Sequence, residues 1–319
     1  MPQPTSSVTF SRREKARLRL ASQGLSVQRW ESAEEVARAF GLMQGQDLHS
    51  VHRSLALRAE DHSDAGSIVR GYPMRNTLFA ASIKDIGWIT ELCAKGRKGE
   101  AELRAEVNKL IENPLSRAEL KERAVTALPD VPFWHVVRVA MESGHAVYSG
   151  ADQLITPVDL PGLEETFNGD KVAATAELMT RYFRTHGPAT LRDFAWWAKL
   201  SQKLIRPAAE NLAPDIVRCG EESQDLVSAE IVEIAEARKK QSVLLLGAFD
   251  EYILGYQDRL FAMTNEVHEA LVPGNRGVFR RAIVVDGQVR GTWNKQDIED
   301  LGMPGYAMRK VQKLWRDAH

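Results

Sequence analysis

The chain has 319 residues, of which 44% are hydrophobic and 27% are charged, and its formal net charge at pH 7 is −1. This length is sufficient for one large core or for two or three small ones, and the composition excludes a wholly disordered protein. The two cysteines, Cys93 and Cys219, are too few for a disulfide framework or a cysteine-rich zinc site. No apolar stretch has the length of a membrane span or the character of a signal-peptide core, so we expect a soluble, cytoplasmic protein with no membrane partner.

Basic side chains are concentrated in two segments, although the net charge is close to zero. Residues 1–30 carry six basic groups against one acid, and residues 270–295 carry five against one. Arginine and lysine make most contacts between proteins and DNA phosphates. The candidate DNA contacts are therefore Arg12, Arg13, Lys15, Arg276, Arg280, Arg281 and Arg290. Helix and strand faces exposed to water are the alternative interpretation.

A helix-start signal occurs three times along the chain. Each signal combines a capping Ser or Thr with an acidic residue three positions later, namely Ser32 with Glu35, Ser116 with Glu119 and Thr190 with Asp193. After each predicted helix come a short break and a second helical pattern. Strand-like runs then follow each helix pair, at residues 77–80, at 145–148 with 153–155, and at 216–218.

Two helices joined by a turn and followed by a β-hairpin form a winged helix. The sequence therefore predicts an α+β fold of tandem winged helix-turn-helix motifs with a C-terminal β-rich region. The predicted boundaries are 1–95, 96–168 and 169–240 for the three winged helices and 241–319 for the C-terminal region. An all-helical bundle with loops is less consistent with strand-like runs after every helix pair. Pro207, inside the last helix of the third unit, is expected to kink or shorten that helix.

Three features are predicted in the C-terminal region. Residues 242–249 have the composition of a buried strand. Asp286-Gly287 lies between two strand-like runs, which is a strong hairpin signal, and we expect this hairpin to project as a wing with Arg281 and Arg290 near DNA. Residues 296–316 are expected to form a terminal amphipathic helix.

The turn of the first helix pair contains the residues best suited to chemistry. Gln44 and Gln46 are two positions apart, and in an extended backbone this spacing can direct both amides toward one site. Asp47 follows them and is well placed to cap the next helix. Two surface glutamines, or phosphate contacts at a helix N-terminus, are the alternative interpretation.

Other chemically active side chains give weaker signals. His49 and His52 are three residues apart on a predicted helix, but no further Cys or His group accompanies them, so we expect no metal site and no cofactor. Asp250 and Glu251 are neighbours on a predicted strand and would point to opposite faces, with one of them able to bind an arginine. Neither is expected to be catalytic.

Several strings resemble a bacterial winged-helix family that includes the AlkZ and YcaQ DNA glycosylases. The string Leu-Met-Gln-Gly-Gln-Asp at residues 42–47 is similar to the family element LQAQD, and residues 74–78 are similar to MRGTLH. Further similar stretches follow in the family's order, at residues 182–194, 248–256, 273–279 and 285–293. Gly45 stands where the family usually has an apolar residue, Phe79 where it often has His, and Asn76 in place of a Gly.

The resemblance implies a monofunctional, metal-independent DNA glycosylase that removes alkylated or crosslinked bases from double-stranded DNA. It implies Gln44 and Gln46 as catalytic residues, with Asp47 as a supporting residue. An N-alkylated purine is already a cationic leaving group, so two amides that position water and stabilise developing charge are sufficient for the chemistry. We expect Gln46 to position the water and the protein to act as a monomer. A non-enzymatic DNA-binding protein, such as a transcriptional regulator, is the alternative.

Overall fold

The computed structural model describes residues 10–27, 29–63, 66–94, 100–219, 223–237 and 242–318. The first unit contains four helices, α1 (Arg12–Ser22), α2 (Ala33–Phe40), α3 (Leu48–Ala56) and α4 (Ile86–Cys93). Its strands are β1 (Trp30–Ser32), β2 (Met43–Gln44), β3 (Ala59–Asp61), β4 (Ile68–Met74) and β5 (Thr77–Ser82). Helices α2 and α3 are therefore followed by the β4–β5 hairpin, as the sequence predicts.

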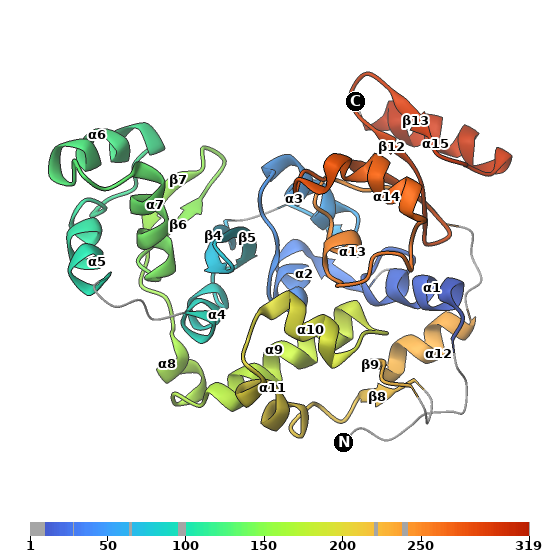
Figure 1. The fold of residues 1–319 in the computed structure, drawn as a ribbon, viewed down its shortest axis with the longest axis horizontal. Coiled ribbons are helices and arrows are strands. Elements are labelled where there is room, and N and C mark those ends of the chain that lie inside the picture. The colour runs from blue at the N-terminus through green and yellow to red at the C-terminus, as the bar shows by residue number, and fades with distance from the viewer. Residues whose placement is uncertain are drawn as a thin grey trace.

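The second unit has the same order of a helix pair and a hairpin. It contains α5 (Glu100–Lys109), α6 (Arg117–Ala127), α7 (Phe133–Glu142), β6 (Ala146–Ser149), β7 (Leu154–Pro157) and α8 (Leu163–Phe167). Most of its buried apolar side chains form a cluster of their own, between α5, α6, α7 and the hairpin. Figure 1 shows these three helices as a lobe at one side of the molecule.

The third unit repeats the pattern with a longer first helix. It contains α9 (Lys171–His186), α10 (Leu191–Ala198), α11 (Gln202–Ala209), β8 (Ile216–Arg218), β9 (Leu226–Ser228) and α12 (Ala229–Ala237). Pro207 lies inside α11, which ends two residues later at Ala209. None of the described helices combines the length and the apolar character that crossing a membrane requires.

The C-terminal region is a four-stranded sheet with helices around it. Its elements are β10 (Val243–Leu245), α13 (Glu251–Leu254), α14 (Asn265–Leu271), the 3-10 turn Pro273–Asn275, β11 (Arg281–Val285), β12 (Gln288–Trp293), β13 (Ile298–Asp300) and α15 (Gly305–Asp317). The strand order is β10-β11-β12-β13, and β10, β11, β12 and β13 pair antiparallel in that order. The predicted strand at 242–249 is shorter than expected: β10 ends at Leu245, and the chain then turns, with a φ of 60° at Phe249.

The predicted start of the terminal helix is wrong. Residues 298–300 form β13, which pairs with β12 through Thr292 and Glu299 and becomes the edge strand of the sheet, and Gly302 then turns the chain at a φ of 98°. Helix α15 begins only at Gly305, directly after Pro304. Strand pairing at an open sheet edge overrode the helical pattern of this segment.

Local capping signals explain where the helices begin. The full capping boxes predicted at Ser116 and Thr190 form, with each acidic side chain accepting from the backbone N–H of the cap residue. At Ser32 the side chain accepts from the N–H of Glu35, but the Glu35 carboxylate accepts from the N–H of Glu31 instead. The start of α2 is thus capped by Ser32 as predicted, but the return hydrogen bond of Glu35 goes to the residue before the cap.

A single sheet joins the first two units. Its strand order is β2-β5-β4-β6-β7, and Arg70 on β4 pairs with Tyr148 on β6. Figure 1 shows β4 and β5 between the lobe of α5 to α7 and helix α2. The largest apolar core takes most of its side chains from the first unit, the third unit and the C-terminal region, including the fully buried Trp88, Trp197 and Tyr252. Strand β2 therefore lies at the edge of the shared sheet, next to the main core.

The Asp286-Gly287 turn forms as predicted, but it does not project as a wing. Both residues have positive φ, 49° and 79°, and Val285 pairs with Gln288 across the turn. Gly287 O accepts a hydrogen bond from Tyr252 Oη at 2.8 Å, and a Cβ on Gly287 would lie 2.9 Å from the Cβ of Ala16. The turn packs against α1 because its glycine leaves room for that helix, and this overturns the expected projecting wing.

Candidate active site

The Gln44–Gln46 segment leaves the edge of the shared sheet. Gln44 pairs with Phe79 of β5, and the N–H of Gly45 donates to Leu78 O at 2.9 Å. Arg70 Nη1 donates to Gly45 O at 2.7 Å. The backbone of this segment is therefore held from both sides before α3 begins.

Gly45 is required by the close approach of β5. A Cβ at this position would lie 2.6 Å from the carbonyl carbon of Phe79 and 2.8 Å from the backbone nitrogen of Ala80. Those atoms belong to a paired strand and cannot move aside as a flexible side chain would. The glycine that departs from the family pattern thus has a steric reason in this chain.

The structure brings the two glutamine amides together. Gln46 Nε2 donates to Gln44 Oε1 at 2.9 Å. Gln44 is 7% exposed, whereas Gln46 is exposed to solvent. One amide is therefore held inside the protein and the other is presented at its surface.

A buried carboxylate that sequence reasoning did not assign to the site anchors Gln44. Glu251 Oε1 accepts from the backbone N–H of Gln44 at 3.0 Å and from Gln44 Nε2 at 3.2 Å. Glu251 is 1% exposed, and its Oε2 lies 3.3 Å from His186 Nε2. The sequence signal is the pair Asp250-Glu251. The sequence predicts a strand here, whereas Asp250 caps α13 and Glu251 is its first residue.

The hydrogen bonds define the orientation of the two amides. The amide nitrogen of Gln44 donates to Glu251 Oε1, so its amide oxygen faces Gln46 and accepts from Gln46 Nε2. The Gln46 nitrogen then faces Gln44, and the Gln46 carbonyl oxygen has no partner among the described residues. This oxygen is available to accept a hydrogen bond from a water molecule or a substrate.

His186 supports Glu251 from inside the core. Its ring stacks on Tyr182 with the centroids 4.4 Å apart, and Thr185 Oγ1 lies 2.9 Å from His186 Nδ1. Gly255 lies against the other side of His186, where a Cβ would come within 2.3 Å of the imidazole Cδ2. The histidine and its carboxylate are therefore fixed by close packing.

Asp250 binds Arg58, in agreement with the expectation that one of the two acids binds an arginine. Its Oδ1 lies 2.7 Å from Arg58 Nη2, and its Oδ2 accepts from Arg58 Nη1 at 3.0 Å and from Ser54 Oγ at 2.7 Å. Burial alone would raise the pKa of Asp250, but Arg58 and these hydrogen bonds hold it below its ordinary value. Asp250 also caps α13 by accepting from the N–H of Tyr252, which sets the position of Glu251.

Asp47 caps α3 as predicted. Its Oδ2 accepts from the backbone N–H of Ser50 at 3.1 Å and from Ser50 Oγ. Ser50 Oγ in turn accepts from the N–H of Ala248 at 2.9 Å, which connects the cap to the segment carrying Asp250. Among the described residues, no three His, Cys, Asp or Glu side chains gather as metal ligands would.

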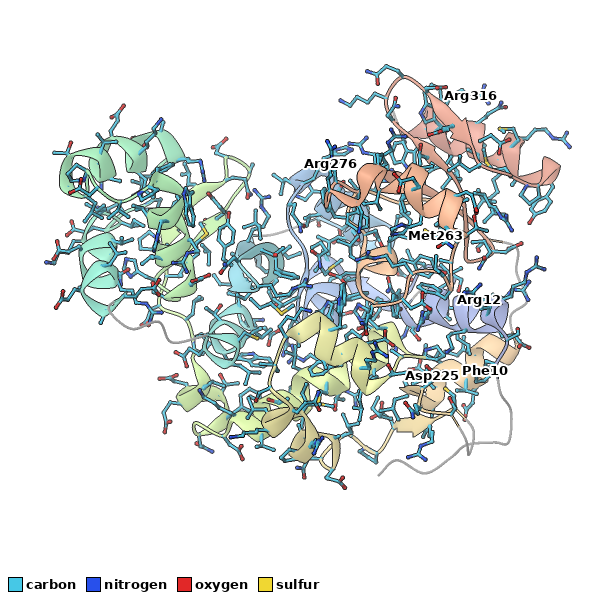
Figure 2. The ribbon with its side chains drawn as sticks, viewed as in Figure 1. Phe10, Arg12, Asp225, Met263, Arg276 and Arg316 are labelled. Carbon is cyan, nitrogen blue, oxygen red and sulfur yellow. The ribbon has the colours of Figure 1, made fainter. Side chains whose placement is uncertain are left out.

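The predicted DNA contacts do not form one patch. Figure 2 shows Arg12 at the start of α1 and Arg276 near α14, well apart on the molecule, and both are exposed. Lys15 Nζ lies 2.6 Å from Asp225 Oδ2. Arg280 pairs with Glu299, Arg281 lies over the ring of Trp293, and Arg290 is half-buried.

Comparison with known proteins shows the family to which the chain belongs. The family model described as DNA glycosylase AlkZ-like matches residues 37–298, which include both glutamines and Glu251. The chain belongs to the AlkZ-like DNA glycosylase family. The resemblance predicted from the sequence is thereby confirmed.

Two relatives come from Streptomyces sahachiroi. An interstrand DNA cross-link repair glycosylase is 26% identical over 140 residues, which cover 42% of this chain and only 37% of that protein. The solved structure of the DNA glycosylase AlkZ superimposes with a TM-score of 0.76 at 19% identity, over 98% of this chain and 97% of that one. The second match shows that the AlkZ fold extends along nearly the whole chain.

Proposed function

We propose that the protein is a monofunctional DNA glycosylase that hydrolyses the N-glycosidic bond of alkylated bases in double-stranded DNA. Bases joined in an interstrand crosslink are part of the proposed substrate range, since the curated relative carries that activity in its name. In this proposal Gln44 and Gln46 are the catalytic residues, and Asp47 supports them by fixing the start of α3.

One observation carries the proposal, namely the series of hydrogen bonds from Glu251 through Gln44 to Gln46. It leaves a carbonyl oxygen of fixed orientation at the protein surface. Fixed dipoles accelerate a reaction because they need no reorganisation when charge develops in the transition state. A pair of solvated glutamines would have no reason to be held by a buried carboxylate.

The chemistry suits an amide. The C1′–N bond breaks with its electron pair moving onto the base, which neutralises the positive charge of an N7-alkylguanine and leaves an oxocarbenium-like sugar. Water held by Gln46 Oε1 attacks C1′ and forms the new C–O bond. A carboxamide is not a base at neutral pH, so the water proton passes to solvent after attack. The proposed reaction requires neither a metal nor a cofactor, because the leaving group is already cationic.

The three helix-pair and hairpin units would bind the DNA as winged helices. They span residues 33–82, 117–157 and 191–228, and one chain supplies all three, so we expect a monomer. The exposed Arg12, Arg13 and Arg276 remain proposed phosphate contacts. Lys15, Arg280, Arg281 and Arg290 are also proposed contacts, although the first two form ion pairs within the protein and the last two are half-buried.

A single-turnover assay tests the proposal. The protein is incubated in excess with duplex DNA carrying one N7-methylguanine, and free base and abasic sites are measured together with DNA binding. We expect equal amounts of released base and abasic sites, without strand cleavage. Binding to the duplex without base release from any alkylated or crosslinked substrate would identify a non-enzymatic DNA-binding protein, the regulator alternative.

A further inference from the structure

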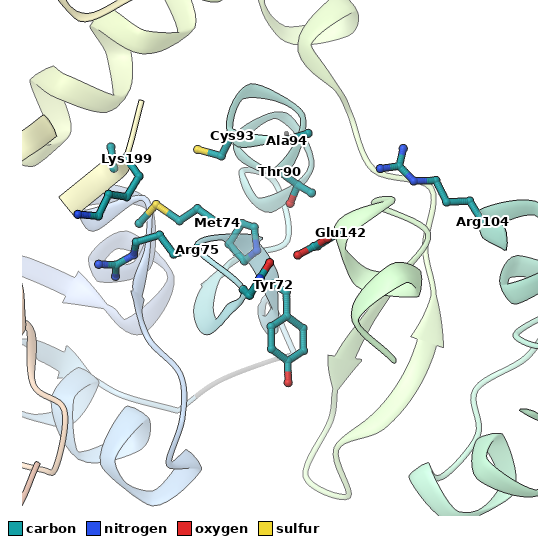
Figure 3. A pocket seen from close by; sticks show the side chains of 12 residues that line it. Tyr72, Met74, Arg75, Thr90, Cys93, Ala94, Arg104, Glu142 and Lys199 are labelled. Carbon is teal, nitrogen blue, oxygen red and sulfur yellow. The ribbon is translucent and has the colours of Figure 1, made fainter. Parts of the chain in front are cut away.

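Three cationic side chains surround the indole of Trp196 on α10. Arg75 Cζ lies 5.8 Å from the ring centroid, Lys199 Nζ lies 5.3 Å from it, and Arg259 Cζ lies 5.5 Å from it. They come from three separate places in the chain: the β4–β5 turn, the end of α10, and the loop after α13. Arg75 and Lys199 also line a cavity of about 380 Å³, and Figure 3 shows their charged ends directed to the same side of it.

The described residues supply no ion-pair partner for these three cations. In the part of the chain that the structure describes, no carboxylate lies within ion-pair distance of Arg75, Lys199 or Arg259. Arg259 Nε donates to Ile253 O at 3.2 Å, and Arg75 Nε is buried without a hydrogen-bond partner. Glu251 attracts Arg75 electrostatically, but both of its oxygens are already engaged.

The cluster is unfavourable for the protein alone. Burial lowers the pKa of Arg75 and of Arg259, and the charge of Arg75 lowers that of Arg259 further. Arg75 and Asn76 also adopt left-handed backbone conformations, with φ of 59° and 50°, at the turn that holds Arg75 in place. Like charges held together at a half-buried site are relieved when an anion binds between them.

The cluster adjoins the catalytic segment. The Arg75 guanidinium lies 5.2 Å from the ring centroid of Phe79, and Phe79 is the cross-strand partner of Gln44. A DNA strand that presents a nucleotide to Gln46 would carry its phosphates past this edge of the sheet. Arginine forks match phosphate oxygens in geometry and charge, and a neighbouring lysine adds a point charge.

We propose that Arg75, Lys199 and Arg259 together bind a phosphodiester of the DNA backbone next to the nucleotide whose base is removed. This site deepens the proposed glycosylase function and rests on it. Its three members lie outside both basic segments that the sequence indicates. They are separated by 124 and 60 residues along the chain, so no local cluster of charge predicts them. Trp196 is the surface that holds the three side chains together.

A thermodynamic cycle tests this contact by removing the charge of the protein side chains and the charge of the DNA phosphate, separately and together. The probe is a duplex with a tetrahydrofuran abasic-site analogue, prepared with one neutral methylphosphonate on either side of the analogue in turn. One of these substitutions should weaken binding by the wild-type protein about tenfold or more, as expected for loss of a charged hydrogen bond. The Arg75→Gln/Arg259→Gln variant should bind the charged duplex correspondingly weakly and should lose little more with that methylphosphonate.

The salt dependence gives a second measurement. Each neutralised phosphate contributes a slope of about −0.9 to log K against log salt, so the fall in affinity between about 50 and 200 mM salt should be about 3.5-fold smaller in the double variant. Lys199→Gln, which changes an exposed side chain, should shift the slope in the same direction if the double variant does not fold. Lys121→Gln on α6 removes one exposed cation elsewhere and should couple to neither methylphosphonate.

Two results overturn the site. The first is an additive effect of variant and methylphosphonate at both positions, and the second is an unchanged salt slope in the double variant and in Lys199→Gln. Failure of the glycosylase proposal is a separate outcome, since it appears as absent base release by the wild-type protein. Coupling between Arg75, Arg259 and one phosphate would still be measured in that case.

Discussion

Glu251 accepts two hydrogen bonds from Gln44, a residue 207 positions earlier in the chain, and both end on the same carboxylate oxygen. One comes from the backbone and fixes the position of Gln44, and the other comes from the side chain and fixes the direction of its amide. The hydrogen bond from Gln46 Nε2 to Gln44 Oε1 in turn orients the amide of Gln46. Orientation at the exposed amide thus originates in a side chain that cannot itself reach a substrate.

Replacement of Glu251 by Gln tests this orienting role. A glutamine at 251 can donate as well as accept, so the Gln44 amide is no longer forced into one direction. We expect single-turnover base release to slow by about 10- to 100-fold, the range found when a supporting polar partner is lost. DNA affinity and the thermal unfolding midpoint should change little.

A charge swap supplies the control for this variant. In Glu251→Gln/Gln44→Glu, the carboxylate at position 44 again accepts from Gln46 Nε2, so Gln46 keeps its orientation. Base release should recover at least part of the loss. If Glu251→Gln alone reacts at the wild-type rate, Glu251 is a packing residue and the orienting role is wrong.

Gln46→Ala removes the carbonyl proposed to hold the water. Loss of one well-placed polar group at a reacting centre lowers the rate by about 100- to 1,000-fold. Binding to the same duplex should be nearly unchanged, because phosphate contacts contribute most of the affinity. Gln44→Ala should also slow the reaction, and Gln46→Glu can keep activity if a base is tolerated there. Wild-type base release by Gln46→Ala would exclude the catalytic assignment.

Gly45→Ala should disturb both stability and activity. The new Cβ would meet the backbone of Phe79 and Ala80 at less than 3 Å, so either β2 or β5 must shift. Overpacking of this kind destabilises a protein by about 1–3 kcal/mol, measurable by urea unfolding, and the shift would misplace both glutamine amides. Gly305→Ala is the matched control, since nothing lies within 4 Å of a Cβ there. Equal free energies of unfolding for the two variants would show that β2 or β5 can shift at little energetic cost.

The Asp250–Arg58 pair should make stability depend on acid pH. The pKa of Asp250 is lowered in the folded protein from an ordinary value of 3.8, so the carboxylate stabilises the fold above that pH and the contribution is lost as the pH falls below it. Asp250→Asn leaves the Arg58 charge buried and should reduce the free energy of unfolding at neutral pH by about 3–5 kcal/mol. Unfolding titrations at neutral pH and near pH 3 should show a smaller difference between variant and wild type at the lower pH.

A surface pair provides the comparison for Asp250. Asp215 and Arg184 form an ion pair that is more than a third exposed on both sides. Asp215→Asn should therefore change stability by less than about 1 kcal/mol at neutral pH. A pH-independent effect of Asp250→Asn would mean that packing, and not charge, stabilises the start of α13.

Local features of the fold follow from the sequence because they depend on residues only a few positions apart. The caps at Ser116 and Thr190, the cap of α3 at Asp47 and the turn at Asp286-Gly287 each form within a span of four residues. The same reasoning located both glutamines at the start of α3. It failed at residues 298–300, where an available sheet edge outweighed a helical pattern.

The sequence by itself determined where most helices and hairpins begin, that two glutamines stand at a turn, and that the chain resembles a glycosylase family. Only the tertiary structure decided which distant residues each of these features contacts. Contacts such as Gln44 with Glu251, Gly45 with β5, the Asp286-Gly287 turn with α1, and the three cations with Trp196 join segments that are distant in the chain. Their formation depends on how whole elements pack around a shared core, and residue spacing along the chain carries no direct record of that packing.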